Sequence, residues 1–314
     1  MMPKSPQATL AAPVRDAGEP VLALDTGVVV MPSPERRRRW RGLLRRLPVL
    51  DVVALCLVVI LLLLIVAGPW LERYPPNAID LTHALLPPGP DHWLGTDDYG
   101  RDIYSRLVAG ARVTLLAALI VVVLGNGLGV LIACLAAISA PRVDQTIMRI
   151  CDIFMAFPAM VLALGIAAAL GPSELSLVIA MTVSLWPGAA RLARGLLRET
   201  MLSDHVAAAK VMGVGVLRRM FRHVLPSVMD QIYVRAALEV AGAIVIFAGL
   251  AFLGVGAQPP SPDWGAMVSE GREFITSAWW IAAAPGAMIT LTAIAFGLAG
   301  DAIAFVLNPA VRDR

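Results

Sequence analysis

Long runs of apolar residues, separated by polar segments, dominate the pattern of this 314-residue chain. A run of about 18 or more apolar residues forms a helix that can cross the roughly 30 Å hydrocarbon layer of a membrane, since each residue adds about 1.5 Å. Six runs fit this requirement, although the fourth is short and is assigned from its context. They lie at positions 49–70, 113–138, 151–170, 175–190, 232–256 and 280–307. The pattern therefore predicts an all-α integral membrane protein with six transmembrane helices.

The polar segments divide the remainder of the chain. Residues 1–48 contain scattered Pro, Gly and Ser and end in a basic flank, so we expect a disordered cytoplasmic leader. The first apolar run exceeds the core of about 7 to 15 residues that is usual in a signal peptide, and no small-x-small cleavage site follows it. We therefore expect an uncleaved helix there. The remaining expected segments are an outer segment at 71–112, a five-helix core at 113–307 with an inner loop at 191–228, and a cytoplasmic tail at 308–314.

The composition and the distribution of charge agree with a membrane protein. Hydrophobic residues make up 58% of the chain and charged residues 16%, whereas soluble domains have about 25% charged residues, so a single water-soluble core is excluded. Basic residues strongly favour the segments on the side of the N-terminus, which places both termini in the cytoplasm. These basic clusters attract anionic lipid headgroups, at about 1 kcal/mol each. Membrane lipid therefore explains them without nucleic acid.

Several kinds of chemistry are not predicted. The chain has two lysines, Lys4 and Lys210, and neither follows a glycine, so a Walker A phosphate loop is excluded and ATP is not bound by that route. The three cysteines lie in apolar surroundings and the four histidines are dispersed, which does not indicate a metal site. No catalytic, cofactor-binding or metal-binding residue is therefore expected.

The inner loop predicts two short helices separated by a glycine. Ser203 can cap the first helix, and Gly213 can adopt the left-handed conformation that ends it. The first helix places small or flat residues on one face that another surface can approach closely: His205, Ala208, Ala209 and Met212. The second carries an apolar stripe: Leu217, Met220, Phe221 and Val224. An amphipathic loop resting on lipid is the alternative interpretation.

Three stretches resemble motifs of bacterial ABC-importer permeases of the peptide and nickel family. The inner loop, with Ala207-Ala208-Ala209, Gly213 and His223-Val224-Leu225-Pro226, resembles the EAA loop, although Ala207 replaces the glutamate of that motif. Residues 92–107 resemble the segment HxLGTDxxGRDxxSRL, and residues 252–265 resemble FLGxGxQPPxPxWG. The long outer segment after an N-terminal span is similar to the C-type subunit of a dipeptide or oligopeptide system.

The resemblance implies a type I ABC importer (MetI-like) permease fold and a permease subunit that moves dipeptides or oligopeptides across the bacterial cytoplasmic membrane. It also implies four partners: a second homologous permease, two ATP-binding subunits that use ATP and Mg, and an extracytoplasmic solute-binding protein. Nickel, another metal chelate or a small solute is the alternative cargo. A secondary transporter and an intramembrane enzyme using Asp152 and Asp301 are more distant alternatives; no convincing internal repeat supports the former, and Leu298 interrupts the Gly-x-Gly-Asp signature of the latter.

Three sets of candidate site residues follow. The resemblance assigns the inner loop to contact with the ATPase, through Ser203, Asp204, His205, Ala208, Ala209, Lys210, Met212, Gly213, Leu217, Phe221 and Pro226. Polar groups within spans are costly and are therefore candidates for the pathway or a gate: Asn126, Asp152, Arg235, Glu239 and Asp301. Arg235 and Glu239 are i, i+4 neighbours, for which an internal ion pair is the simplest explanation. Candidates for docking of a binding protein are Asp97, Asp98, Arg101, Asp102, Gln258, Asp263 and Trp264.

Overall fold

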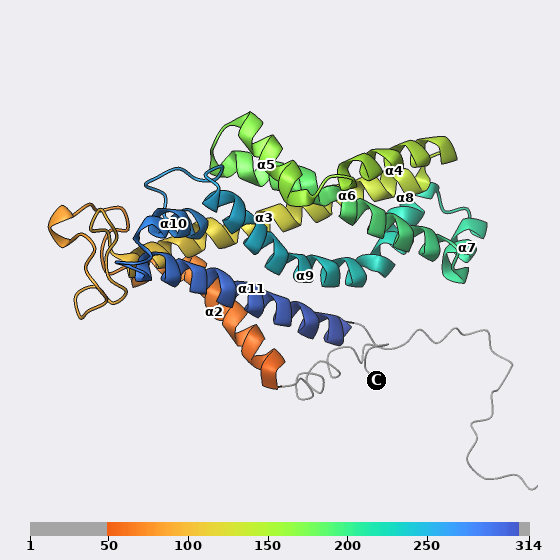
Figure 1. Cartoon of the computed structure of the whole chain (residues 1–314). Helices are drawn as coiled ribbons and strands as arrows, with labels where there is room; N and C mark the ends of the chain where they lie inside the picture. Colours follow the sequence, from red (N-terminus) through yellow and green to blue (C-terminus); the bar gives the residue numbers. More distant parts are fainter. Residues whose placement is uncertain (1–48, 308–314) are drawn as a thin grey trace, which may run out of the picture. The chain divides into compact units, whose positions relative to one another are not determined.

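The computed structural model describes residues 49–307, which belong to one compact unit and are largely helical (Figure 1). The predicted leader at 1–48 and the tail at 308–314 lie outside the described residues. The elements are α2 (Val49–Leu71), η1 (Leu81–His83), α3 (Ile103–Ile138), α4 (Pro141–Met155), α5 (Ala159–Leu170), α6 (Glu174–Met201), α7 (Asp204–Val211), α8 (Val216–Arg219), η2 (Met220–Val224), α9 (Leu225–Phe252), α10 (Trp264–Gly271), η3 (Arg272–Phe274) and α11 (Trp280–Leu307).

The number of spans agrees with the prediction. Within residues 49–307, five helical segments are long and apolar enough to cross a membrane: α2, α3, α6, the continuous segment from α8 to α9, and α11. A sixth span results when α4 and α5 are counted together. The all-α, multi-span fold class is therefore confirmed.

The third predicted span is wrong as a continuous helix. Its residues are divided between α4 and α5, which meet at an angle of 87°. The break coincides with Pro158, which precedes α5 and lacks the N–H that a continuing helix would need. Proline also disfavours the helical conformation at the residue before it, here Phe157. The apolar run contained this signal, but hydrophobicity alone does not register it.

The other predicted boundaries differ at three helices, and a cap explains the first of these differences. α3 begins at Ile103 instead of position 113, because the Asp102 carboxylate accepts a hydrogen bond from the Ser105 N–H at 2.8 Å. α6 continues past 190 to Met201, and α9 begins before 232 and ends at Phe252. α2 and α11 agree with the predicted spans to within a residue.

Small residues bring the central helices close together. At Gly129 of α3, an added Cβ would lie 2.6 Å from the Cβ of Ala189 and 2.8 Å from the backbone nitrogen of Ala190, both on α6. Such close backbone approach is typical of helix packing in membranes. α9 and α11 pack against each other, and α11 also packs against α2.

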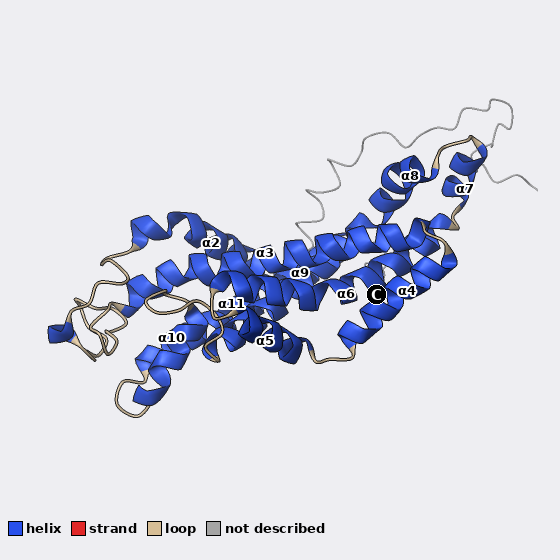
Figure 2. Ribbon diagram, turned by 90° about the horizontal axis from the view of Figure 1, so that it is seen from above, coloured by secondary structure: helices blue, strands red, loops and turns tan. Residues whose placement is uncertain are grey.

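The two polar regions of the chain lie at opposite ends of the helices. Figure 2 shows α10 at one end and α7 with α8 at the other, with α3, α6 and α9 running between them. The outer segment around η1 lies at the α10 end, as Figure 1 also shows. This arrangement matches the predicted alternation of outer and inner segments.

Candidate functional site

The inner loop begins with a short helix that ends in a defined turn. α7 starts after Ser203, as predicted, but the Ser203 hydroxyl donates to the Thr200 carbonyl at 2.5 Å instead of capping the helix. At the other end, the Gly213 N–H donates to Lys210 O (3.0 Å) and the Val214 N–H to Ala209 O (3.1 Å). These two bonds form a Schellman motif. Gly213 has a φ of +79°, which confirms the predicted left-handed conformation.

The face that α7 presents to the outside differs from the prediction. Ala209 is only 1% exposed, and Val206 packs in a cluster with Leu197 of α6 and Val224 of η2. The assignment of Ala209 to the exposed face is therefore wrong, whereas the other three residues predicted there, His205, Ala208 and Met212, are exposed. Val206 explains the difference, because its larger apolar side chain turns the 206/209 side of α7 toward the protein. Met212, by contrast, is 75% exposed.

The second helix of the loop is not a separate element. α8 continues through a π-helical turn, η2, into α9, where the Leu225 N–H donates to Met220 O, five residues earlier. Pro226 follows at the start of α9, directly after the π-helical turn. The predicted apolar stripe divides here: Met220 and Val224 are buried, whereas Leu217 and Phe221 are exposed. The loop is thus joined directly to a transmembrane helix.

Large apolar side chains remain exposed along this loop. We call them the loop surface: Leu202, Val211, Met212, Val216, Leu217 and Phe221. The basic residues Lys210, Arg218 and Arg222 of the same stretch are also exposed. Water-exposed surfaces of proteins seldom carry so many large apolar side chains close together unless another molecule covers them. The loop surface therefore has the character of an interaction site.

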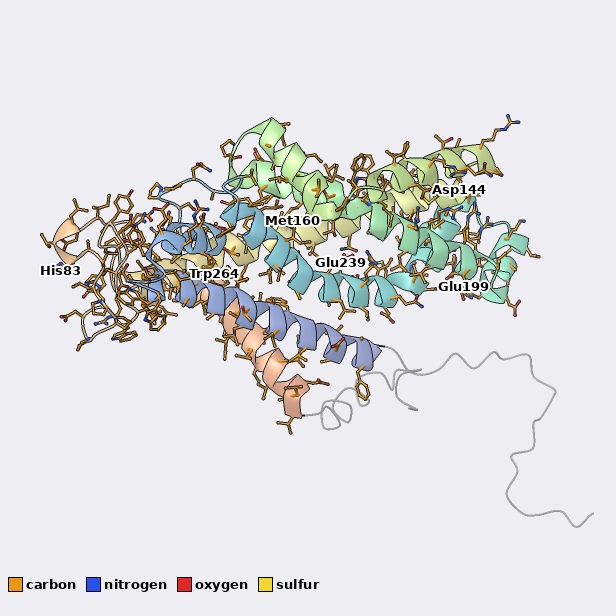
Figure 3. The ribbon with its side chains drawn as sticks, in the orientation of Figure 1. His83, Asp144, Met160, Glu199, Glu239 and Trp264 are labelled. Atoms are coloured by element: carbon orange, nitrogen blue, oxygen red, sulfur yellow. The ribbon has the colours of Figure 1, made fainter. Side chains whose placement is uncertain are left out.

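A second group of predicted residues meets in the middle of the bundle. Arg235 and Glu239 form the expected ion pair on α9. Asn126 on α3 donates through Nδ2 to Glu239 Oε2 at 2.7 Å and to the Val122 carbonyl at 3.0 Å. Figure 3 shows Glu239 between the ribbons of α9 and α6. Three of the five pathway candidates therefore lie together.

The other two pathway candidates lie elsewhere. Asp152 on α4 pairs with Arg191 on α6, and both side chains are nearly half exposed. Asp301 is exposed on α11. A further ion-pair group was missed by the sequence analysis: the buried Asp144 carboxylate accepts hydrogen bonds from Arg194 and Arg198 and ties α4 to α6. Its members are about fifty positions apart, so no local spacing signals it.

The outer end contains a buried network of charges. The Asp97 carboxylate accepts from Arg101 Nε at 2.6 Å, and it also accepts from the Arg101 backbone N–H at 2.9 Å. Glu270 on α10 accepts from Nη2 of Arg101 (2.9 Å) and Nη2 of Arg106 (3.2 Å). We call these four residues the outer charge network. It connects the stretch at 92–107, singled out in the sequence, to α10, although Arg106 and Glu270 were not predicted as site residues.

The predicted docking residues around α10 are also buried. Asp263 caps α10 by accepting from the N–H groups of Gly265 (2.8 Å) and Ala266 (3.0 Å), and burial raises the pKa of its carboxyl. The Trp264 indole N–H donates to the Leu107 carbonyl at 2.9 Å. These contacts hold α10 against the start of α3. Their side chains therefore shape the outer surface without being exposed on it.

The exposed docking candidates are fewer than predicted. Asp97, Arg101 and Asp102 are buried in this chain, and Asp102 serves as the cap of α3. Asp98 is partly exposed, and Gln258 is exposed. Burial and the neighbouring Asp97 raise the pKa of the Asp98 carboxyl. Both line an outer pocket of about 700 Å³. Docking of a binding protein at this pocket stays a prediction.

These features define a class of protein. The chain is a multi-pass helical membrane protein with an outer segment held by buried contacts and an exposed apolar loop surface at the other end. A family model described as binding-protein-dependent transport system inner membrane component matches residues 125–313, more than half of the chain. A second model, the N-terminal transmembrane domain of oligopeptide transport permease C, matches residues 39–88. The chain belongs to the family of binding-protein-dependent transport system inner membrane components, which have the MetI-like fold.

Relatives of known name agree with this assignment. The chain is 41% identical over 281 residues to the probable D,D-dipeptide transport system permease protein of Escherichia coli, covering 88% of this chain and 94% of the relative. It is 36% identical over 294 residues to the di/tripeptide transport system permease protein of Pseudomonas aeruginosa, covering 91% and 95%. It is 40% identical over 269 residues to the dipeptide transport system permease protein of Escherichia coli, covering 83% and 89%.

Proposed function

We propose that this chain is a permease subunit of an ATP-driven importer that moves short peptides across the bacterial inner membrane. Support for peptides as cargo comes from relatives whose names specify D,D-dipeptides, dipeptides and di- or tripeptides, at 36% to 41% identity over most of the chain. The chain itself is non-catalytic in this proposal. Its complex contains a second permease, two ATP-binding subunits that use ATP and Mg, and an extracytoplasmic binding protein.

One observation carries the mechanism: the loop surface is continuous with a transmembrane helix. Met212 and Leu217 are exposed where an ATPase subunit can cover them, and the chain runs on from α8 through η2 into α9 without a break. A displacement of the loop by closure of the ATPase dimer is therefore transmitted along α9. The bundle then exchanges inward for outward access as a two-state element.

The orientation follows from the same arrangement. The loop surface lies in the cytoplasm, where ATP is available, and the outer segment with α10 lies on the opposite side. An even number of spans then places both termini in the cytoplasm, in agreement with the excess of basic residues in the inner segments. The pocket beside Asp98 and Gln258 is the corresponding place for a solute-binding protein to deliver its cargo.

Uptake and complex isolation test this proposal together. The permease should co-isolate with subunits that hydrolyse ATP, and its deletion should abolish uptake of radiolabelled alanyl-alanine. Uptake of nickel that depends on this chain, with peptide uptake unchanged, would assign the alternative cargo. Isolation without any ATP-hydrolysing partner, combined with peptide uptake driven by a proton gradient, would contradict the proposal.

A further inference from the structure

The charged pair on α9 lies near the middle of this helix, within the predicted span at 232–256. Glu239 is about 20 Å from either end of α9, at about 1.5 Å per residue. At the centre of a transmembrane helix a charged side chain costs about 2.5 to 3.5 kcal/mol on insertion scales, and a charged side chain within a span usually faces a pathway or the bundle interior. Arg235 and Glu239 stand on the same helix, so their pairing alone does not join two helices. Glu239 links α9 to α3 through Asn126, whereas Glu239 is the one ion-pair partner of Arg235 among the described residues, so helix packing does not account for Arg235.

Both charged side chains open onto a cavity. Arg235 is 33% exposed and Glu239 19%, and they line a space of about 320 Å³ between the α4–α5 break, α6 and α9. The remaining walls are mostly apolar and include Phe154, Met155, Phe157, Met181, Leu185 and Ile246. This volume is at the lower end of the roughly 300 to 1,000 Å³ typical of small-molecule sites. The cavity thus combines one positive and one negative group with apolar walls.

The pair has hydrogen-bonding capacity that the chain does not use. Among the described residues, Arg235 Nε and Asn126 Oδ1 are buried without a hydrogen-bond partner. A guanidinium carries five N–H donors and a carboxylate about four acceptor positions, far more than the internal pair occupies. Asn126 fixes Glu239 from behind through its Nδ2. Gly188 of α6 leaves space in front of Arg235, because an added Cβ would lie 3.1 Å from Arg235 Nη2.

We propose that Arg235 and Glu239 form a transient subsite for the two charged ends of a short peptide on its way through the membrane. Arg235 binds the terminal carboxylate, for which its planar guanidinium is suited, and Glu239 binds the terminal ammonium. The apolar walls receive the peptide side chains. This inference deepens the peptide-import function proposed above and depends on it.

The spacing of the pair favours very short peptides. Side chains at i and i+4 are about 5 to 6 Å apart at their Cβ atoms. The ends of an extended dipeptide are about 7 Å apart, at about 3.3 to 3.6 Å per residue, and each further residue adds the same increment. Binding exchanges one internal ion pair for two intermolecular ones, so neither charge is left unpaired. The net gain in binding free energy is therefore small, and weak binding lets the peptide leave the subsite and continue along the pathway.

Photolabelling of the permease–ATPase complex in lipid nanodiscs tests the subsite without the binding protein. The probe is photo-methionyl-alanine, a dipeptide that labels its surroundings under ultraviolet light. We expect label on the segments containing Met155 and Met181, suppressed by excess alanyl-alanine and not by N-acetyl-alanyl-alanine amide. Arg235→Gln and Glu239→Gln should each reduce the label and cellular uptake of alanyl-alanine at least about tenfold. Arg198→Gln removes one of the two arginine partners of Asp144, away from the cavity, and this matched control should change neither by more than about twofold.

A variant that keeps both charges tests the subsite even if Arg235→Gln and Glu239→Gln fail to reach the membrane. Gly188→Ala presses on the Arg235 guanidinium and should raise the KM for alanyl-alanine several-fold with normal protein levels. An unchanged KM in Gly188→Ala, or unchanged labelling and uptake in correctly inserted Arg235→Gln and Glu239→Gln, would overturn the subsite while wild-type uptake leaves the proposed function standing. Absence of peptide uptake by the wild type would overturn both.

Discussion

The two ends of the bundle differ in their main features: a buried network of charges at the outer end and a continuous exposed apolar loop at the inner end. At the outer end, charged side chains such as Asp97 and Arg101 are buried and paired within the chain. At the inner end, apolar side chains such as Val211 and Met212 are 89% and 75% exposed. The outer segment therefore pairs its buried charges within the chain, although Leu81 and Trp93 are exposed there, whereas the loop surface gathers its exposed apolar side chains along one short stretch. This difference indicates a pre-formed outer platform and an inner loop that is completed by assembly.

The largest expected effect is on the outer charge network. Glu270→Ala removes the acceptor of both Arg101 and Arg106 and leaves two buried guanidinium groups with one carboxylate. Breaking a buried ion pair typically costs about 3 kcal/mol or more, so we expect the thermal midpoint of the detergent-solubilised protein to fall by several degrees. Glu273→Ala, at an exposed position nearby, is the control. Equal stability of the two variants would contradict the role of the network.

The next effect concerns the loop surface. Met212→Glu places a charge on the exposed apolar side of the loop and should abolish co-purification of the ATPase subunits, with uptake reduced about thirtyfold or more. That reduction corresponds to about 2 kcal/mol, the loss typical of a hot-spot residue. The permease should still reach the membrane with its thermal midpoint unchanged.

A matched control for this variant lies at the opposite end. Leu81 is exposed in η1 of the outer segment. Leu81→Glu makes the same chemical change there, and we expect the ATPase subunits to remain bound. If Met212→Glu retained the ATPase subunits as well as Leu81→Glu does, the distinction between the two ends would fail.

A smaller effect is expected at the turn after α7. Gly213 has a φ of +79°, which costs a residue with a Cβ about 1 to 2 kcal/mol, so Gly213→Ala should increase hydrogen exchange in α7 about tenfold. Gly215 has a φ of −60° and open space around it, so Gly215→Ala should leave the exchange unchanged. Equal exchange in both variants would show that the left-handed turn does not hold the helix.

The smallest effect concerns Asp98, which is partly exposed in the outer segment. Because its pKa is raised above 3.8 in the folded protein, the folded state holds this proton more tightly than the unfolded state. The contribution of Asp98 to stability is therefore lost as pH rises from that ordinary value through the raised pKa. Asp98→Asn should remove this pH dependence and raise the free energy of unfolding at neutral pH by a few tenths of a kcal/mol. A lower stability of the variant at neutral pH would contradict this sign.

The pattern of apolar runs and the motifs predicted the spans, because a helix in lipid needs a long hydrophobic run regardless of which tertiary contacts it makes. The i, i+4 pairing of Arg235 and Glu239 and the turn at Gly213 were predictable for a different reason, because both are set by local geometry. The break at Pro158 was visible in the sequence but was outweighed by the apolar composition around it.

Other features depend on contacts between distant segments. Glu270 meets Arg101 across 169 positions, and Asn126 meets Glu239 across 113. Ala209 was assigned to the wrong face because the choice between the two sides of a short, alanine-rich helix is made by packing against α6 and η2. A bulky substitution at Ala209 would therefore disturb the loop itself, and Met212 is the better position for testing the contact.

ATP-driven uptake by the purified complex in proteoliposomes tests the central claim most directly. With the binding protein outside and ATP inside, we expect radiolabelled alanyl-alanine to accumulate against its gradient, and we expect no accumulation when the ATPase subunits are omitted or the permease carries Met212→Glu. Accumulation that needs no ATPase subunit, or that continues unchanged with Met212→Glu, would contradict import coupled through the loop surface.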